Sequence, residues 1–244
     1  MGSDKKDYPL KKYYQEIYER YDLVNRIFTF GQDRNWRKKA VSACLENNPH
    51  TVLDICTGTG DLILAIARKA GKEILLKGYD FSAEMLSKAH EKAATQKLDI
   101  EFIEGDVAAM PFGENTFDSA GITFGIRNLV YENSNASLHL GEIFRVLKPG
   151  GRLVILESSK PDSVLWRFLN NLYLRFILPY LGGIISGNLK AYKYLAKSSK
   201  NYYSRSEMAA ILEDAGLTVI RSRALFLGSV MLMIAEKQVN QSTN

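Results

Sequence analysis

The spacing of apolar residues changes near residue 50. Before that point, apolar and aromatic residues recur three and four positions apart, which predicts helices over residues 11–46. From residue 51 onward, short β-branched runs alternate with helical segments, a pattern typical of a parallel sheet covered by helices on both faces. The predicted strands cover 51–56, 74–79, 100–104, 117–124 and 152–157, and the predicted helices cover 61–70, 82–95 and 137–147.

A second change follows strand five, because residues 160–205 interrupt the alternation. A helix over 206–215, with Ser206 as its expected N-cap, then leads to strands over 217–225 and 230–237. The short connection between these last strands implies an antiparallel pair. The sequence therefore predicts a doubly wound, Rossmann-like α/β fold: a mostly parallel seven-stranded sheet with one antiparallel strand, N-terminal helices, and a helical insertion after strand five.

We expect a single domain over 1–244 with four parts. These are an N-terminal helical cap, a ligand-binding core, a helical insertion for an acceptor, and a closing helix with a hairpin, over 1–46, 51–159, 160–205 and 206–237. The composition, 46% hydrophobic and 24% charged over 244 residues, excludes a disordered chain, a collagen-like repeat and a coiled coil. Two cysteines, Cys44 and Cys56, are too few for a disulfide framework or a four-cysteine metal site, so we expect no metal and a cytoplasmic location.

The net charge of +5 is unevenly distributed. Residues 160–205 carry eight basic groups and one acidic group, and within them 164–180 form an amphipathic pattern with Arg167 and Arg175 on one face. Such a helix can lie at a membrane surface, cover a long apolar ligand, or pack on the sheet. The arginines and Pro179 argue against a membrane span over Val164 to Ile185. A peripheral contact with the inner face of the membrane and a homodimer stay open, and no nucleic acid is expected.

A glycine-containing loop follows the first strand, in the run Asp54-Ile55-Cys56-Thr57-Gly58-Thr59-Gly60-Asp61. Glycines let a ligand approach the backbone, and the next helix offers free N–H groups. Asp80 ends the second strand, where a carboxylate can accept both ribose hydroxyls of an adenosine. The pair of features indicates an adenosine cofactor.

Two absences narrow the choice of cofactor. A dinucleotide loop needs a third glycine where this chain has Ile63, which disfavours a NAD-dependent oxidoreductase. The chain also lacks the Gly-Lys-Ser/Thr of a nucleotide triphosphate site.

The loop resembles that of the class I S-adenosylmethionine-dependent methyltransferases, with Cys56 in the place of their first glycine. This resemblance implies that the backbone of the loop holds the methionine end of S-adenosyl-L-methionine, that Asp106 meets the adenine, and that Thr123 lies beside the cofactor. The cofactor-binding residues predicted in this way are Asp54, Gly58, Thr59, Gly60, Asp80, Phe81, Asp106, Val107 and Thr123.

Three further segments resemble the menaquinone/ubiquinone biosynthesis C-methyltransferases: residues 21–36, Phe124-Gly125-Ile126-Arg127-Asn128, and 145–159. That resemblance implies C-methylation of a prenylated quinol, either demethylmenaquinol or a polyprenyl benzoquinol. The chain departs from the family pattern at several positions, including Asp33 in place of a histidine. Another small phenolic or lipid acceptor, or an RNA-binding or RNA-modifying role for the basic segments, remain alternatives.

The candidate catalytic residues are Arg127, Asn128 and Tyr21. Arg127 stays protonated, so it is a poor base, but beside Asn128 it can orient a water or stabilise a phenolate. Tyr21 is a candidate near the mouth of the acceptor site. The histidines, His139 among them, lie outside the motif loops and are expected to be structural or solvated, and Asp33 is expected to be a solvated carboxylate.

Overall fold

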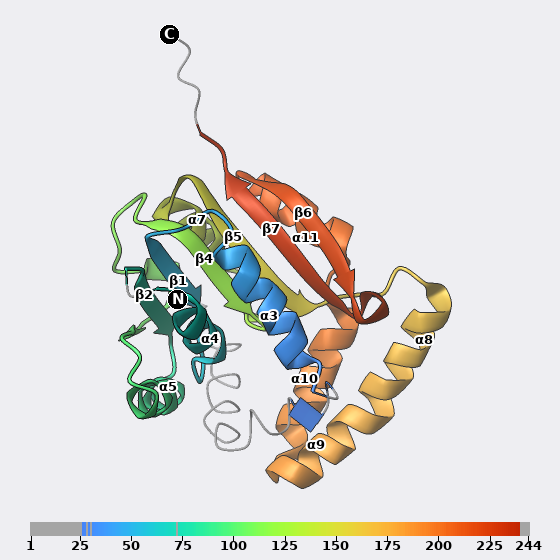
Figure 1. Cartoon of the computed structure of the whole chain (residues 1–244). Coiled ribbons are helices and arrows are strands. Elements are labelled where there is room, and N and C mark those ends of the chain that lie inside the picture. The colour runs from blue at the N-terminus through green and yellow to red at the C-terminus, as the bar shows by residue number, and fades with distance from the viewer. Residues whose placement is uncertain (1–25, 28, 30, 72, 240–244) are drawn as a thin grey trace, which may run out of the picture.

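The computed structural model describes residues 26–27, 29, 31–71 and 73–239 (Figure 1). A seven-stranded sheet has the order β3-β2-β1-β4-β5-β7-β6, in which only β7 runs antiparallel to its neighbours. The strand bounds are Thr51–Ile55 (β1), Leu75–Asp80 (β2), Glu101–Glu104 (β3), Phe117–Thr123 (β4), Leu147–Ser158 (β5), Leu217–Leu225 (β6) and Val230–Lys237 (β7). The predicted fold class is confirmed, since the chain order of the strands reverses beside β1 as in other doubly wound sheets.

Helices cover both faces of the sheet (Figure 1). One face carries α3 (Asp33–Cys44), α4 (Asp61–Lys69) and α5 (Ala83–Thr95), and the other carries α6 (Ile126–Val130), α7 (Ala136–Val146) and α11 (Arg205–Asp214). Short 3-10 turns follow β3 and β6, at η1 (Val107–Ala109) and η3 (Phe226–Gly228). The central strands are therefore buried on both sides, which explains their nearly continuous apolar sequences.

The N-cap of α11 and the start of β5 differ from the prediction by more than one residue. The N-cap of α11 is Ser204 and not Ser206: the Ser204 hydroxyl accepts the Glu207 N–H, and the Glu207 carboxylate accepts the Ser204 N–H. This reciprocal capping box satisfies the Ser204 and Glu207 N–H groups, which have no partner inside the helix. Strand β5 starts at Leu147, five residues before the expected Arg152, because Phe117 pairs with Leu147 across an irregular step in the register.

The insertion after β5 consists of α8 (Val164–Leu172), a π-helical turn η2 (Tyr173–Ile177), α9 (Leu178–Ser186) and α10 (Leu189–Asn201). The helix continues past Pro179, which lies in the first turn of α9, directly after the π-helical turn η2. Among the described residues, Val164–Ile185 is the one helix whose length and composition would suffice to cross a membrane, and 22% of its most apolar window is buried. Val164–Ile185 is thus one continuous helix that contains the π-helical turn η2.

Candidate functional site

The loop after β1 has the backbone that a ligand cradle requires. Cys56, Gly58 and Gly60 all have positive φ, at 53°, 53° and 81°. The Thr57 N–H donates to the Tyr79 carbonyl of β2 at 3.1 Å, which ties the loop to the next strand. A Cβ added to Gly58 would meet no atom within 4 Å, so this side of the backbone is open to a ligand.

Asp54 lies beneath the loop and accepts hydrogen bonds from it. Its Oδ2 accepts the Thr57 hydroxyl at 2.6 Å and the Ile63 N–H at 3.2 Å, while Oδ1 is buried and has no hydrogen-bond partner among the described residues. Burial raises the pKa of Asp54 from its ordinary 3.8 to about 7, and the two donated hydrogen bonds oppose that rise. The structure places this predicted site residue beneath the loop, where it fixes the loop's shape.

Asp80 joins β2 to the same loop. Its Oδ2 accepts the Gly58 N–H at 2.8 Å and its Oδ1 accepts the Ser82 N–H at 2.9 Å. The side chain is almost completely buried, and burial raises the pKa of the carboxyl. A carboxylate offers about four acceptor sites in all, so this one keeps acceptor capacity for a hydroxyl. Asp80 is therefore hydrogen-bonded to the glycine loop, and its contact with a ribose stays a prediction.

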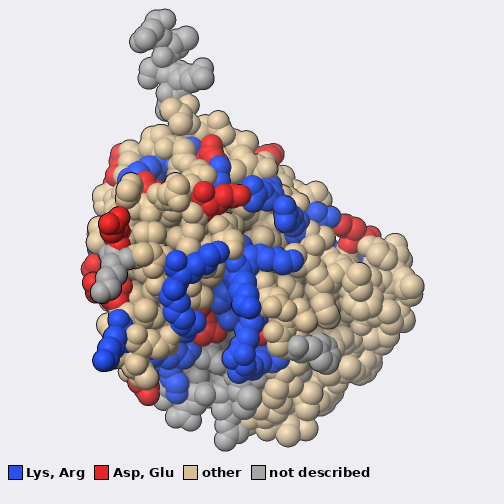
Figure 2. All heavy atoms as spheres, viewed as in Figure 1, with Lys and Arg blue, Asp and Glu red and all other residues tan. Residues whose placement is uncertain are grey.

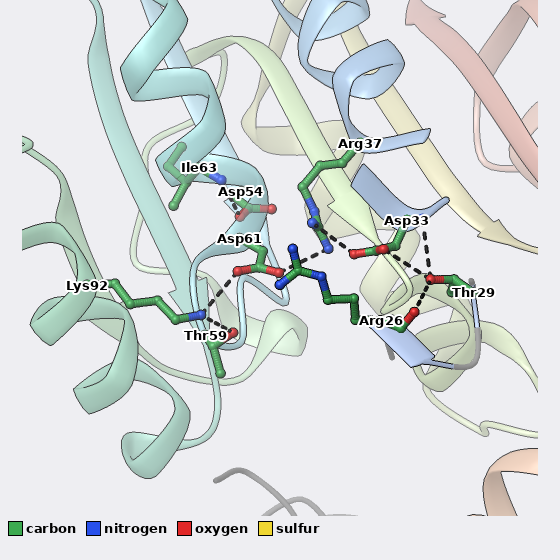
Figure 3. A network of polar contacts seen from close by, with 9 residues as sticks. All are labelled: Arg26, Thr29, Asp33, Arg37, Asp54, Thr59, Asp61, Ile63 and Lys92. Atoms are coloured by element: carbon green, nitrogen blue, oxygen red, sulfur yellow. Dashed lines mark hydrogen bonds and ion pairs between the residues drawn. The ribbon is translucent and has the colours of Figure 1, made fainter. Parts of the chain in front are cut away.

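A network of charged side chains surrounds the start of α4 (Figure 3). Asp61 pairs with Lys92 of α5 at 3.1 Å and with Arg37 of α3 at 3.1 Å, and Lys92 also donates to the Thr59 hydroxyl at 3.0 Å. Arg26 points toward Asp61 in the same view. These contacts connect three helices to the loop, and they depend on helix packing that the sequence pattern does not reveal.

Asp33 belongs to this network, which corrects the expectation of a solvated carboxylate. It is buried at the start of α3, accepts the Thr29 hydroxyl at 3.0 Å and pairs with Arg37 at 3.4 Å. The fold tolerates this buried carboxylate because both of its oxygens have a hydrogen-bond donor or cation nearby. Asp33 therefore links the segment before α3 to the ion pairs around Asp61.

Asp106 follows β3 and caps the turn η1, where its Oδ1 accepts the Ala108 N–H at 2.9 Å. His139 of α7 is buried close by, with Nε2 3.7 Å from Asp106 Oδ1 and Nδ1 2.9 Å from the Leu129 carbonyl. A carbonyl only accepts, so Nδ1 donates to it. His139 is thus a buried structural histidine, one of the two expectations for it, yet it faces a predicted cofactor residue.

The other predicted cofactor residues lie at the same edge of the sheet. Val107 is buried in η1, Phe81 lies directly after β2, and Thr123 ends β4. Because the carboxyl ends of parallel strands share one edge, these positions surround the loop after β1. Every predicted cofactor residue therefore lies at this edge of the sheet, either near the end of a strand or on the loop itself.

Arg127 lies in a buried cluster beyond β4 and β5. Its Nη1 donates to Ser158 at 2.9 Å and to Ser199 of α10 at 2.6 Å, and lies 3.7 Å from Glu157 Oε1. The Arg127 N–H also donates to Glu157 Oε2 at 3.4 Å. Arg127 is thus a buried ion-pair partner that connects the insertion to the sheet. Its partner Glu157 appeared in the sequence only as part of a motif.

The segment before Arg127 contacts the glycine loop. A Cβ added to Gly125 would lie 2.6 Å from the Cys56 Cβ, so Gly125 makes room for the side chain that replaces the usual glycine. Burial and nearby carboxylates raise the pKa of Cys56, which keeps a thiol and not a thiolate beside the loop. Asn128 follows in α6, and Tyr21 lies outside the described residues.

These features fit the nucleoside and amino-acid parts of S-adenosylmethionine: an open glycine backbone, an oriented carboxylate at the end of β2, and polar groups around the loop. Residues 2–237 match the model of the ubiE/COQ5 methyltransferase family. The chain belongs to this family. It is a methyltransferase, and its methyl donor is S-adenosylmethionine.

Relatives in the family are similar over nearly their whole length. A demethylmenaquinone methyltransferase of Thermus thermophilus is 40% identical over 92% of this chain and 99% of its own. A ubiquinone/menaquinone biosynthesis C-methyltransferase UbiE of Geobacter sulfurreducens is 38% identical over 93% of this chain and 88% of its own.

Solved structures agree on the fold. A SAM-dependent methyltransferase of Aquifex aeolicus has a TM-score of 0.56 at 24% identity, over 77% of this chain and 82% of its own. An O-methyltransferase family protein of Burkholderia thailandensis has a TM-score of 0.65 at 17% identity, over 91% of this chain and 60% of its own. At these identities the likeness concerns the fold alone.

Proposed function

We propose that this methyltransferase transfers the methyl group to a ring carbon of a prenylated quinol, demethylmenaquinol or a polyprenyl benzoquinol. The observation that carries the proposal is the full-length similarity to relatives named for that reaction. The glycine loop, Asp80 and the segment Phe124–Asn128 meet at one edge of the sheet, which supports a donor site and an acceptor site side by side. Arg127, just beyond β4, places a guanidinium near that edge, where it is paired with the buried Glu157 carboxylate.

The donor supplies an activated methyl group, and the chain must position the acceptor and exclude water. Positioning of this kind can contribute ~7–11 kcal/mol to the lowering of a barrier. The reduced quinol is the acceptor, because loss of a hydroxyl proton makes the adjacent ring carbon nucleophilic. The oxidised quinone ring is electron-poor, so it cannot take its place.

Arg127 and Asn128 are the proposed catalytic residues. The Arg127 guanidinium is buried with Glu157, Ser158 and Ser199, so its orientation is fixed before any acceptor binds. A fixed cation stabilises a developing phenolate without reorganisation. Tyr21 is the third proposed catalytic residue, and its role rests on the resemblance of residues 21–36 to the family.

The proposed site of action is the cytoplasmic face of the membrane, since a polyprenyl tail keeps the acceptor in lipid. The long helix of α8 and α9 supports this location, because its outward side chains are apolar and exposed. The enzyme would then bind the membrane peripherally and take the quinol ring from its surface.

The test is incubation with labelled S-adenosylmethionine and a panel of reduced and oxidised naphthoquinols and benzoquinols. We expect label in a product from at least one prenylated quinol, and none from the matching oxidised quinone. Absence of labelled product from every quinol, together with label in another phenol or in RNA, would refute the proposed acceptor class.

A further inference from the structure

The outward face of α8 and α9 is the largest run of exposed apolar side chains in the described part of the chain. Trp166, Leu174 and Gly182 turn inward, while most of the intervening side chains point to solvent. The exposed apolar residues of this face are Val164, Leu165, Phe168, Leu169, Leu172, Phe176, Ile177, Tyr180, Leu181 and Ile184. Figure 2 shows a broad area over these helices with neither blue nor red atoms. Patches of this kind mark interaction sites.

The inward side of the helix is fixed to the domain. The Trp166 indole N–H donates to the Ser229 hydroxyl at 3.1 Å, and the Trp166 ring packs edge-on against Phe226. Tyr192 of α10 packs where a Cβ on Gly182 would lie, so α10 returns along α9. Arg127 then holds Ser199 of α10 to the end of β5. Both ends of the apolar helix are therefore attached to the same domain. This favours a helix that lies on a membrane surface over one that crosses a membrane.

The charged residues around the outward face of α8 and α9 indicate what this face binds. Between Asp162 and Glu207 the chain has no acidic residue and seven lysines or arginines. The Arg175 guanidinium lies over the Phe176 ring at 5.2 Å, and the Lys193 ammonium lies over the Tyr180 ring at 5.9 Å. Cations at the margin of an apolar, aromatic face fit the headgroup layer of an anionic bilayer, with the apolar side chains in the acyl region.

We propose that the outward face of Val164–Ile185 is a docking surface for an anionic lipid bilayer, on which the helix lies parallel to the membrane. This inference rests on the proposed function for its purpose, since a prenylated acceptor is reached from the bilayer. Its physical basis is independent of catalysis: an exposed apolar face, basic margins without acidic residues, and a helix held to the domain along its inner side.

The experiment is cosedimentation of the full chain with vesicles, without cofactor or quinol, so that failure of the proposed reaction leaves the result unaffected. The test variant is Leu165→Glu, at a side chain 70% exposed, and its matched control is Leu138→Glu on α7, 52% exposed and outside this face. Phe168→Glu is a second test variant. Thermal unfolding followed by circular dichroism checks that each variant folds.

We expect the wild type and Leu138→Glu to sediment with phosphatidylglycerol vesicles and less with pure phosphatidylcholine vesicles. Leu165→Glu removes one leucine side chain from the acyl region, so its partition onto these vesicles should be lower by about 10-fold or more. High salt should weaken binding to the phosphatidylglycerol vesicles. Three results would overturn the proposal: no sedimentation of the wild type, equal losses in Leu165→Glu and Leu138→Glu, or a lipid-free dimer in sedimentation velocity that Leu165→Glu dissociates.

Discussion

Replacement of Asp54 by asparagine should change how the stability of the protein depends on pH. The carboxyl is buried beneath the glycine loop, and only Oδ2 accepts hydrogen bonds, from Thr57 and Ile63. An asparagine can put its carbonyl oxygen at the Oδ2 position and its amide nitrogen at the Oδ1 position. Oδ1 has no partner in the described structure, so the amide adds an unsatisfied donor at a cost of ~1–3 kcal/mol that does not vary with pH.

The size of the effect follows from the pKa of Asp54, which burial raises from 3.8 to about 7. A carboxyl whose pKa is higher in the folded state binds its proton more tightly there. Its stabilising contribution is complete below the unfolded pKa and is lost as the pH rises through the folded pKa. A difference of about three pKa units corresponds to at most ~4 kcal/mol at full ionisation. The uncharged amide of the Asp54→Asn variant carries no such contribution.

The assay is urea unfolding of the wild type and Asp54→Asn at intervals from about pH 4 to about pH 8. Titrating groups that do not interact with Asp54 are common to both proteins and cancel in the difference. Asp80 is an exception, because its charge contributes to the raised pKa of Asp54, so the difference reports the titration of this coupled pair. We expect the wild type to lose free energy of unfolding relative to Asp54→Asn as the pH rises, by a few kcal/mol across this range. A difference that is constant with pH, or that changes in the opposite direction, would refute the reasoning.

Three other predictions concern cofactor binding, catalysis and the packing of the sheet. In Asp80→Asn, the side-chain amide N–H would face either the Gly58 N–H or the Ser82 N–H, and the contact with the ribose would weaken. Calorimetry with S-adenosylhomocysteine should therefore show ~10- to 100-fold weaker binding. Arg127→Ala should reduce kcat much more than cofactor affinity, with partial rescue in Arg127→Lys, and unchanged turnover would remove Arg127 from the mechanism. Gly78→Ala should destabilise the fold by ~1–3 kcal/mol in urea unfolding, because its Cβ would lie 2.7 Å from the Phe102 ring; an unchanged midpoint would contradict this packing.

The sheet and its ligand edge could be predicted from sequence because their signals are local. The apolar runs, the glycine loop and Asp80 all lie within single strands or turns, and both closing strands begin and end where the alternation indicates. The predicted N-cap of α11 is wrong by two residues, since Ser204 and Ser206 are both suitable caps and the choice depends on Glu207.

Most of the polar contacts that support the site could not be predicted, because they depend on tertiary packing. Asp61 meets Arg37 only when α3 packs beside α4, and Arg127 meets Glu157 only across two strand ends. The Asp33–Arg37 pair is the exception, since these residues lie four positions apart on one helix. The exposed side of the apolar helix could not be predicted either, for the same reason as most of these contacts. Its periodicity indicates an amphipathic helix, but which side faces the domain depends on Trp166 and Gly182.

The central claim is that the loop after β1 and the carboxylate of Asp80 bind the nucleoside of S-adenosylmethionine. A crystal structure with S-adenosylhomocysteine tests it most directly. The account predicts both ribose hydroxyls within hydrogen-bond distance of the Asp80 carboxylate and the homocysteine end against the open backbone of Gly58. A nucleoside bound elsewhere, or a saturating soak that leaves this edge of the sheet without ligand, would contradict it.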